Sequence, residues 1–71
     1  MNPLTQQQKA VLKYLTSFIR KNGYPPTRQE IADEMGFASA NGAQAHLKAL
    51  ARKGRIALTL GVFRGIKVRG R

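Results

Sequence analysis

Three helix starts, each followed by a glycine stop, organise the sequence as far as Gly54. In a capping box, a hydroxyl and the side chain three residues later satisfy backbone amides that the first helical turn leaves unpaired. The starts are two such boxes and one serine N-cap: Thr5 with Gln8, Thr27 with Glu30, and Ser39. The stops are Asn22-Gly23, Gly36 and Gly54. These signals predict helices over about 5–22, 28–35 and 40–53.

Apolar side chains recur at helical spacing and give each predicted helix one side to bury. They are Val11, Leu12, Leu15, Phe18 and Ile19, then Ile31, Ala32 and Met35, then Ala43, Leu47, Leu50 and Ala51. After Gly54 the apolar spacing changes to strict alternation, which is typical of half-buried strands. The alternating residues are Ile56, Leu58 and Leu60, then Ile66 and Val68, with 61–65 as the connecting loop. A β-hairpin over about 55–69 is therefore predicted.

The order of these elements is helix, short helix, tight turn, helix and hairpin. A short capped helix joined to a longer helix by a glycine-containing turn is typical of a helix-turn-helix, to which the hairpin would add a wing. We therefore predict a mainly α fold with a small β-hairpin, a three-helix winged helix-turn-helix. A chain of 71 residues supports one modest core, so this is expected to be a single domain over 1–71.

The charge of the chain is large and unevenly placed. Thirteen Lys and Arg against three acids give a net charge of +10 and a pI of about 11.4. The acids are Glu30, Asp33 and Glu34, and none follows them. The cations from position 48 onward are Lys48, Arg52, Lys53, Arg55, Arg64, Lys67, Arg69 and Arg71. A strongly basic half attracts polyanions, of which nucleic acid is the commonest and a membrane surface the competing choice.

Several other functions find no support in these residues. The chain has no cysteine and His46 is its only histidine, so neither a metal site nor a nucleophile–base pair can be assembled. We therefore expect no catalysis, no cofactor, no metal and no small-molecule substrate. No segment is long and apolar enough to cross a bilayer, and no signal peptide precedes the fold. The expected location is the cytoplasm, in association with the nucleoid.

The third predicted helix carries the residues best suited to read DNA. In a helix-turn-helix, the N-terminal residues of this helix meet base edges in the major groove. The exposed residues expected there are Ser39, Asn41, Gln44 and Ala45. Asn and Gln can bond adenine twice, Ser can bond several base edges, and Ala can contact the thymine methyl. Phosphate contacts are expected from Arg28, Lys48, Arg52, Arg64, Lys67 and Arg69.

Other residues near this surface have more than one interpretation. Gly42 costs about 1 kcal/mol against alanine inside a helix, so it either allows close approach to a DNA group or is a tolerated neutral change. Phe63 at the hairpin tip either inserts against DNA or packs on the third helix, and packing is slightly favoured. His46 is expected to be half-buried, with Tyr14 and Tyr24 at the edge of the core rather than stacked on bases.

Several segments between Leu4 and about Val68 form a specific combination. They are Leu4-Thr5, Gly23-Tyr24-Pro25-Pro26-Thr27-Arg28, Glu30-Ile31-Ala32, Gly36-Phe37, Ser39, Asn41, His46-Leu47-Lys48-Ala49-Leu50-Ala51-Arg52-Lys53-Gly54, Ile56 and Arg64-Gly65-Ile66. Taken together, these segments resemble the N-terminal domain of the SOS repressor family LexA. The resemblance implies a three-helix winged domain that binds operator DNA. It implies backbone contacts from Arg28, Lys53 and the wing, and base contacts from Ser39, Asn41, Gly42, Gln44 and Ala45.

The chain departs from this family in two respects. The family usually carries acids at positions 44 and 45 and often proline at 40, where this chain has Gln44, Ala45 and Ala40. The loss of the two carboxylates at positions 44 and 45 should change the preferred DNA sequence. These differences indicate a divergent relative from a phage, plasmid or other mobile element. The family's self-cleaving serine–lysine domain, which also makes its dimer, is absent from these residues. A stand-alone small protein or an excised domain is expected, and the former could not leave DNA by self-cleavage.

The expected function is that of a sequence-specific double-stranded DNA-binding transcriptional regulator, a LexA-like repressor. Two other classes stay open. One is a protein-interaction module that modulates a repressor or polymerase through the acids at 30–34, and the other is a sequence-neutral, nucleoid-type DNA binder. Without a heptad pattern or a large apolar patch, we expect a monomer in solution that pairs, if at all, on a palindromic site.

Overall fold

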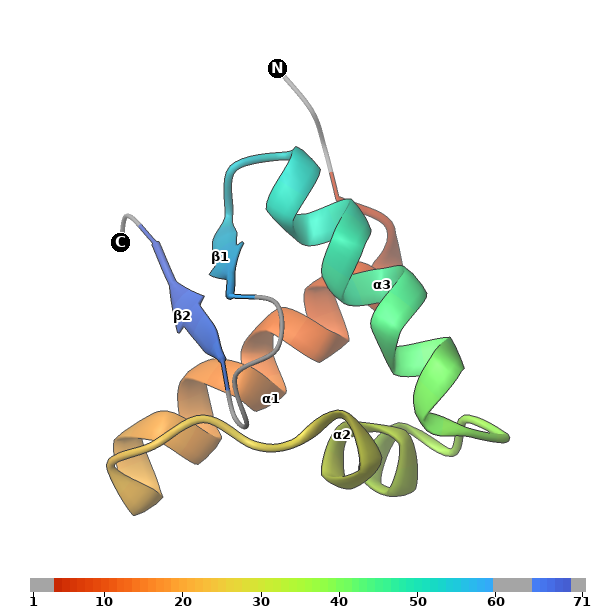
Figure 1. Ribbon diagram of the computed structural model, residues 1–71, viewed down its shortest axis with the longest axis horizontal. Coiled ribbons are helices and arrows are strands. Elements are labelled where there is room, and N and C mark those ends of the chain that lie inside the picture. Colours follow the sequence, from red (N-terminus) through yellow and green to blue (C-terminus); the bar gives the residue numbers. More distant parts are fainter. Residues whose placement is uncertain (1–3, 60–64, 70–71) are drawn as a thin grey trace.

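The structure is a computed structural model and describes residues 4–59 and 65–69. Within this part of the chain it forms three helices and two strands: α1 (Gln6–Asn22), α2 (Arg28–Met35), α3 (Ala40–Arg52), β1 (Ile56–Leu58) and β2 (Ile66–Val68). In Figure 1, α3 and the two strands stand on opposite sides of the view, with α1 crossing between them and α2 below α3. The predicted winged helix-turn-helix is therefore confirmed.

The helices begin where the capping chemistry of the sequence places them. The Thr5 hydroxyl accepts from the Gln8 amide and Gln8 Oε1 accepts from the Thr5 amide, both at 3.1 Å. Thr27 and Glu30 form the same box at the start of α2, with distances of 3.1 and 2.8 Å. The Ser39 hydroxyl accepts an amide of the first turn of α3 at 3.3 Å. Because Thr5 is itself the cap, α1 begins at Gln6 rather than at the predicted residue 5.

The helix ends also depend on backbone geometry. Gly23 and Gly36 end α1 and α2 with φ of 83° and 78°, a left-handed conformation that glycine adopts without a steric penalty. The end of α3 differs, because Lys53 is its C-cap with φ of −84° and Gly54 takes the left-handed conformation after it. The helix predicted to reach residue 53 therefore ends at Arg52.

The hydrophobic core lies where the three helices meet the hairpin. Its buried residues are Val11, Leu15, Ile31, Ala32, Ala43, Leu47, Leu50, Ile56 and Ile66. Leu12, Met35, Phe37, Ala51, Leu58 and Val68 are half-buried and pack against it. Phe18 lies between Tyr14 and Tyr24, with ring centroids 5.8 Å from each. Tyr24, predicted at the edge of the core, is 47% exposed because it lies over Phe18 outside that core.

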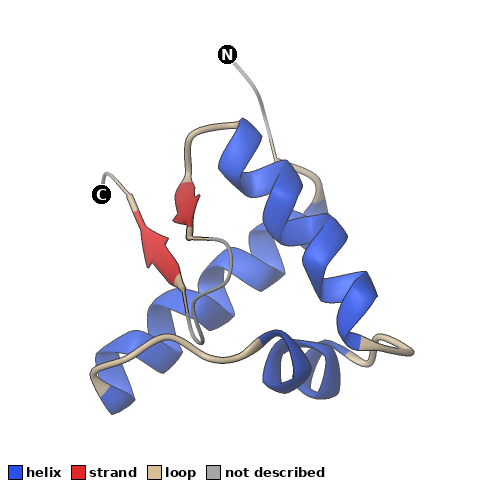
Figure 2. Cartoon of the chain, in the orientation of Figure 1, coloured by secondary structure: helices blue, strands red, loops and turns tan. Residues whose placement is uncertain are grey.

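The two strands form a hairpin (Figure 2), and their apolar residues lie in the core or pack against it. The antiparallel strands β1 and β2 pair Ile56 with Val68 and Leu58 with Ile66. One further backbone hydrogen bond at each end, of 2.9 and 2.8 Å, extends the pairing: Arg69 to Arg55 and Thr59 to Gly65. Leu60 and residues 61–64 of the predicted loop, among them Phe63 and Arg64, lie outside the described residues.

Candidate nucleic-acid interface

One face of α3 is exposed along the length of the helix. Asn41, Ala45, Lys48 and Arg52 are exposed and follow one another at spacings of four, three and four residues, which aligns them in one row. We call this row the α3 stripe. The opposite face of the helix is buried and carries Ala43, Leu47 and Leu50. The stripe therefore begins with an amide at the N-terminal turn and continues through a small residue to two cations.

Gln44 differs from the residues of the α3 stripe because it is half-buried and already bonded. Arg28 Nε donates a hydrogen bond to Gln44 Oε1. Arg28 is the first residue of α2 and Gln44 lies 16 residues further along, in α3. The bond therefore joins the two helices of the helix-turn-helix beside the N-terminal part of the α3 stripe. Sequence reasoning assigned these two residues separate roles, one at a phosphate and one at a base.

Gly42 makes room for a side chain of the turn between α2 and α3. A Cβ atom at Gly42 would lie 3.2 Å from Phe37 Cβ and 3.4 Å from Phe37 Cγ. The Phe37 ring stacks on His46, with centroids 4.9 Å apart and planes 15° from parallel. Phe37 thus packs on two positions one turn apart in α3, and His46 is half-buried as predicted. This contact is a third explanation for Gly42, which the two predicted alternatives did not include.

Gly42→Ala is expected to stabilise the protein by clearly less than the roughly 1 kcal/mol by which alanine is favoured over glycine in a helix. The reason is that Phe37 must move by a few tenths of an ångström to admit the methyl group. In a Phe37→Ala background the same substitution should recover the full amount. Urea unfolding of the four proteins of this double-mutant cycle measures the coupling. Equal effects of Gly42→Ala in both backgrounds would contradict it.

The C-terminal end of α3 is tied to the start of α1. Lys53 Nζ donates to Gln8 Oε1 at 2.8 Å, and the same oxygen accepts from the Thr5 amide. Lys53 is consequently half-buried, although the family resemblance placed it at the DNA backbone. Five other described residues were predicted to contact the DNA backbone. Arg28 is half-buried, and the other four are exposed: Lys48, Arg52, Lys67 and Arg69.

The three acidic residues of the chain lie on α2, and their charges affect a tyrosine of α1. Burial, and then the negative charges of Glu34, Glu30 and Asp33, raise the pKa of the Tyr14 hydroxyl above its ordinary value. The α3 stripe carries only cations among its charged groups, Lys48 and Arg52. The acids therefore lie on a different helix from the α3 stripe, and the stripe is a surface suited to a polyanion.

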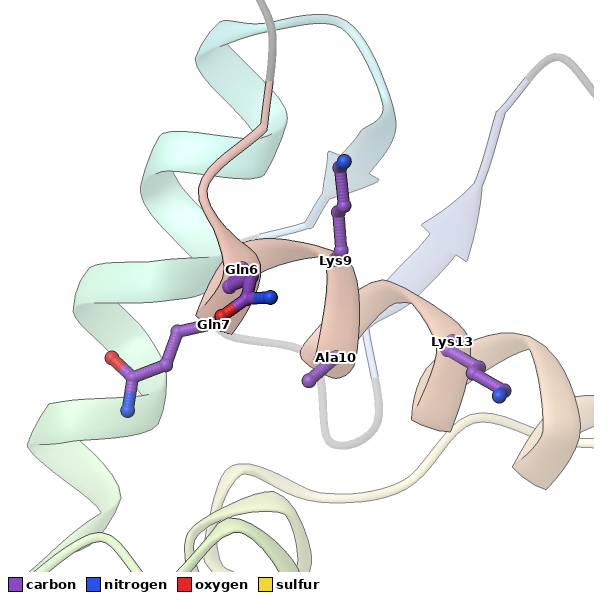
Figure 3. A pocket seen from close by; sticks show the side chains of 5 residues that line it. All are labelled: Gln6, Gln7, Lys9, Ala10 and Lys13. Carbon is purple, nitrogen blue, oxygen red and sulfur yellow. The ribbon is translucent and has the colours of Figure 1, made fainter.

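A metal site, a membrane-spanning helix and a binding pocket are the other features to consider in the described residues. Across 4–59 and 65–69, no three His, Cys, Asp or Glu lie together as a metal site would require. In the same residues, no helix has the length and apolar character needed to cross a membrane. A shallow hollow on α1 is lined by Gln6, Gln7, Lys9, Ala10 and Lys13. Figure 3 shows these side chains splaying apart rather than converging, so they do not form a binding constellation.

Comparison with known proteins identifies the family. Residues 1–65 match the model of the LexA DNA-binding domain. The chain belongs to the LexA DNA-binding domain family. The family indicated by the resemblance in the sequence is thereby confirmed. The winged helix-turn-helix of α2, α3 and the hairpin is accordingly the framework of a LexA-type domain.

LexA repressors from several bacteria are similar to this LexA-type chain. The LexA repressor of Pseudomonas chlororaphis is 53% identical over 70 residues, which are 99% of this chain and 35% of the relative. That of Saccharophagus degradans is 54% identical over 68 residues, 96% of this chain and 34% of the relative. That of Pseudomonas aeruginosa is 50% identical over 70 residues, 99% of this chain and 34% of the relative. The chain thus spans about a third of the length of these relatives.

Proposed function

We propose that this chain is a sequence-specific double-stranded DNA-binding domain of a LexA-like transcriptional repressor, with α3 in the major groove. The observation that carries the proposal is the α3 stripe. It presents Asn41 at the N-terminal turn of a capped helix and places Lys48 and Arg52 further along the same face. An amide can read a base edge while cations about two and three turns away contact phosphates, which sets the position of the helix in the groove.

The proposed contacts divide into two groups. Base edges are read by Ser39, Asn41, Gly42, Gln44 and Ala45. The DNA backbone is contacted by Arg28, Lys48, Arg52, Lys53, Lys67 and Arg69, and by Arg64 outside the described residues. Lys53 is the weakest member, because contact with a phosphate competes with its bond to Gln8. In this proposal the domain is non-catalytic, acts at the nucleoid, and is a monomer that pairs only on a palindromic site.

Asn41→Ala tests this function directly. The substitution is expected to weaken binding to the preferred duplex by roughly 10- to 100-fold, because a well-placed amide contributes about 1–3 kcal/mol of base discrimination. Binding to a scrambled duplex should change little, since the phosphate contacts remain. The preferred duplex is selected from random sequences, and both affinities are measured by fluorescence anisotropy. Ser17→Ala, on an exposed part of α1, is the matched control.

The two other classes of function give different results. A wild-type chain without measurable affinity for any duplex would favour a protein-interaction module. Equal affinities for the preferred and scrambled duplexes, both unaffected by Asn41→Ala, would favour a sequence-neutral nucleoid protein. Either result would contradict sequence-specific repression.

A further inference from the structure

The bond between Arg28 and Gln44 fixes which atom of the Gln44 amide faces α2. A guanidinium group has five N–H donors and no acceptor. The atom of Gln44 that meets Arg28 Nε must therefore be the carbonyl oxygen, Oε1. Only one of the two orientations of the Gln44 amide can bond to Arg28, because its NH2 group cannot accept a hydrogen bond from a guanidinium N–H. The Gln44 NH2 group consequently points away from Arg28.

The location of Gln44 makes this orientation important for DNA recognition. Gln44 lies in α3 between Asn41 and Ala45 of the α3 stripe, and Asn41, three residues earlier, is its neighbour on the helix surface. Gln44 is half-buried, so its amide has less freedom to turn than those of exposed residues. The Nη groups of Arg28 are not used by the bond through Nε, which leaves them for a phosphate. Arg28 can therefore hold Gln44 and contact the DNA backbone together.

We propose that Arg28 is a positioning residue that presents Gln44 to the major groove as a hydrogen-bond donor. The inference rests on the proposed DNA-binding function and specifies how one position of α3 reads its base. Guanine offers the acceptors N7 and O6 in the major groove, and thymine offers O4. Cytosine offers only the donor N4–H2, which an outward NH2 group opposes. Adenine places the donor N6–H2 beside its acceptor N7, and this donor opposes the outward NH2 group, so Gln44 selects guanine or thymine on the strand that it faces.

The same arrangement disfavours the pairing ordinarily expected of glutamine. Glutamine bonds adenine twice, by donating to N7 and accepting from N6. The second bond requires Oε1 to face the base, whereas the bond to Arg28 turns this oxygen toward α2. The base preferred by Gln44 in this chain should therefore differ from the base preferred by a glutamine at position 44 that no neighbouring residue holds.

Gln44→Glu is the sharpest test, because it exchanges the outward donor for an acceptor while Arg28 keeps its partner oxygen. Preferences of wild type and variant are measured by selection from random duplexes, with Gln44→Ala showing which base pair position 44 reads. We expect the preference at that base pair to move from guanine or thymine to cytosine or adenine. The change should be roughly 3- to 10-fold, the worth of one hydrogen bond. An unchanged preference in Gln44→Glu would overturn the assignment.

Arg28→Met tests the positioning role itself by removing the donor and keeping the length of the side chain. The preference at the Gln44 base pair should shift toward adenine, while preferences elsewhere in the site stay the same. Lys9→Met is the matched control, because it removes one exposed positive charge from α1. Thermal unfolding followed by circular dichroism establishes that each variant is folded.

The outcomes separate this inference from the function on which it rests. A uniform loss of affinity in Arg28→Met, with the base preferences unchanged, would make Arg28 a phosphate contact only and overturn the inference. A preference at the Asn41 base pair that survives such a result would leave the proposed function intact. A wild-type chain without any sequence preference would overturn the proposed function and the inference together.

Discussion

Raising the concentration of monovalent salt from about 50 to about 200 mM is expected to weaken duplex binding by several hundred-fold. Each cation that contacts a phosphate releases counterions, so log affinity falls with log salt at about −0.9 per contact. Five of the cations predicted to contact phosphates lie within the described residues, without counting Lys53: Arg28, Lys48, Arg52, Lys67 and Arg69. Roughly five contacts give a slope of about −4 to −5.

The salt dependence is measured as the slope of log Kd against log salt on a scrambled duplex. Lys48→Met removes one cation from the α3 stripe and should flatten the slope by about one. Lys13→Met removes an equal charge from exposed α1 and should leave the slope nearly unchanged. A wild-type slope flatter than about −2 would count against a DNA backbone as the partner.

Leu47→Ala is expected to lower the free energy of unfolding by about 3 kcal/mol, because it opens a cavity at a fully buried position. Leu47 lies on α3 directly behind the α3 stripe, in the core shared with Ile31 of α2. A domain of this size has a total stability of roughly 4–10 kcal/mol, so the loss is a large fraction of it. Tm should fall by roughly 12–24 °C.

Differential scanning calorimetry or urea unfolding measures this effect. The matched control is Lys48→Ala at the adjacent, exposed position, where the change should stay within about 0.5 kcal/mol. A loss below about 1 kcal/mol for Leu47→Ala would mean that the packing around α3 closes the cavity, contrary to the fully buried position of this residue.

The parts of the fold that depend on near neighbours could be predicted from the sequence. The Thr5 and Thr27 capping boxes join residues three apart, and Gly23 ends its helix one residue after the last turn. The alternation from Ile56 likewise predicts which strand residues face the helices. The ranges of the helices consequently differ from the predictions by one residue at most.

Contacts between distant segments could not be predicted in the same way. Arg28 and Gln44 are 16 residues apart, and Gln8 and Lys53 are 45 apart, so their bonds depend on how the helices pack. A helical period shows that Gln44 lies near the exposed face but not that a side chain of α2 holds it. The contact of Phe37 with Gly42 escaped prediction for the same reason, because the turn brings the ring over α3.

The bond between Lys53 and Gln8 has a practical consequence for labelling this protein. It places the start of α1 beside the end of α3 that lies furthest from Asn41, as Figure 1 also shows. The 13 residues of α3 extend for about 20 Å along the helix axis. A fluorophore or fusion partner joined ahead of Leu4 would therefore enter the molecule about one helix length from the base-reading turn. A sensor built on this domain should carry its reporter at that end.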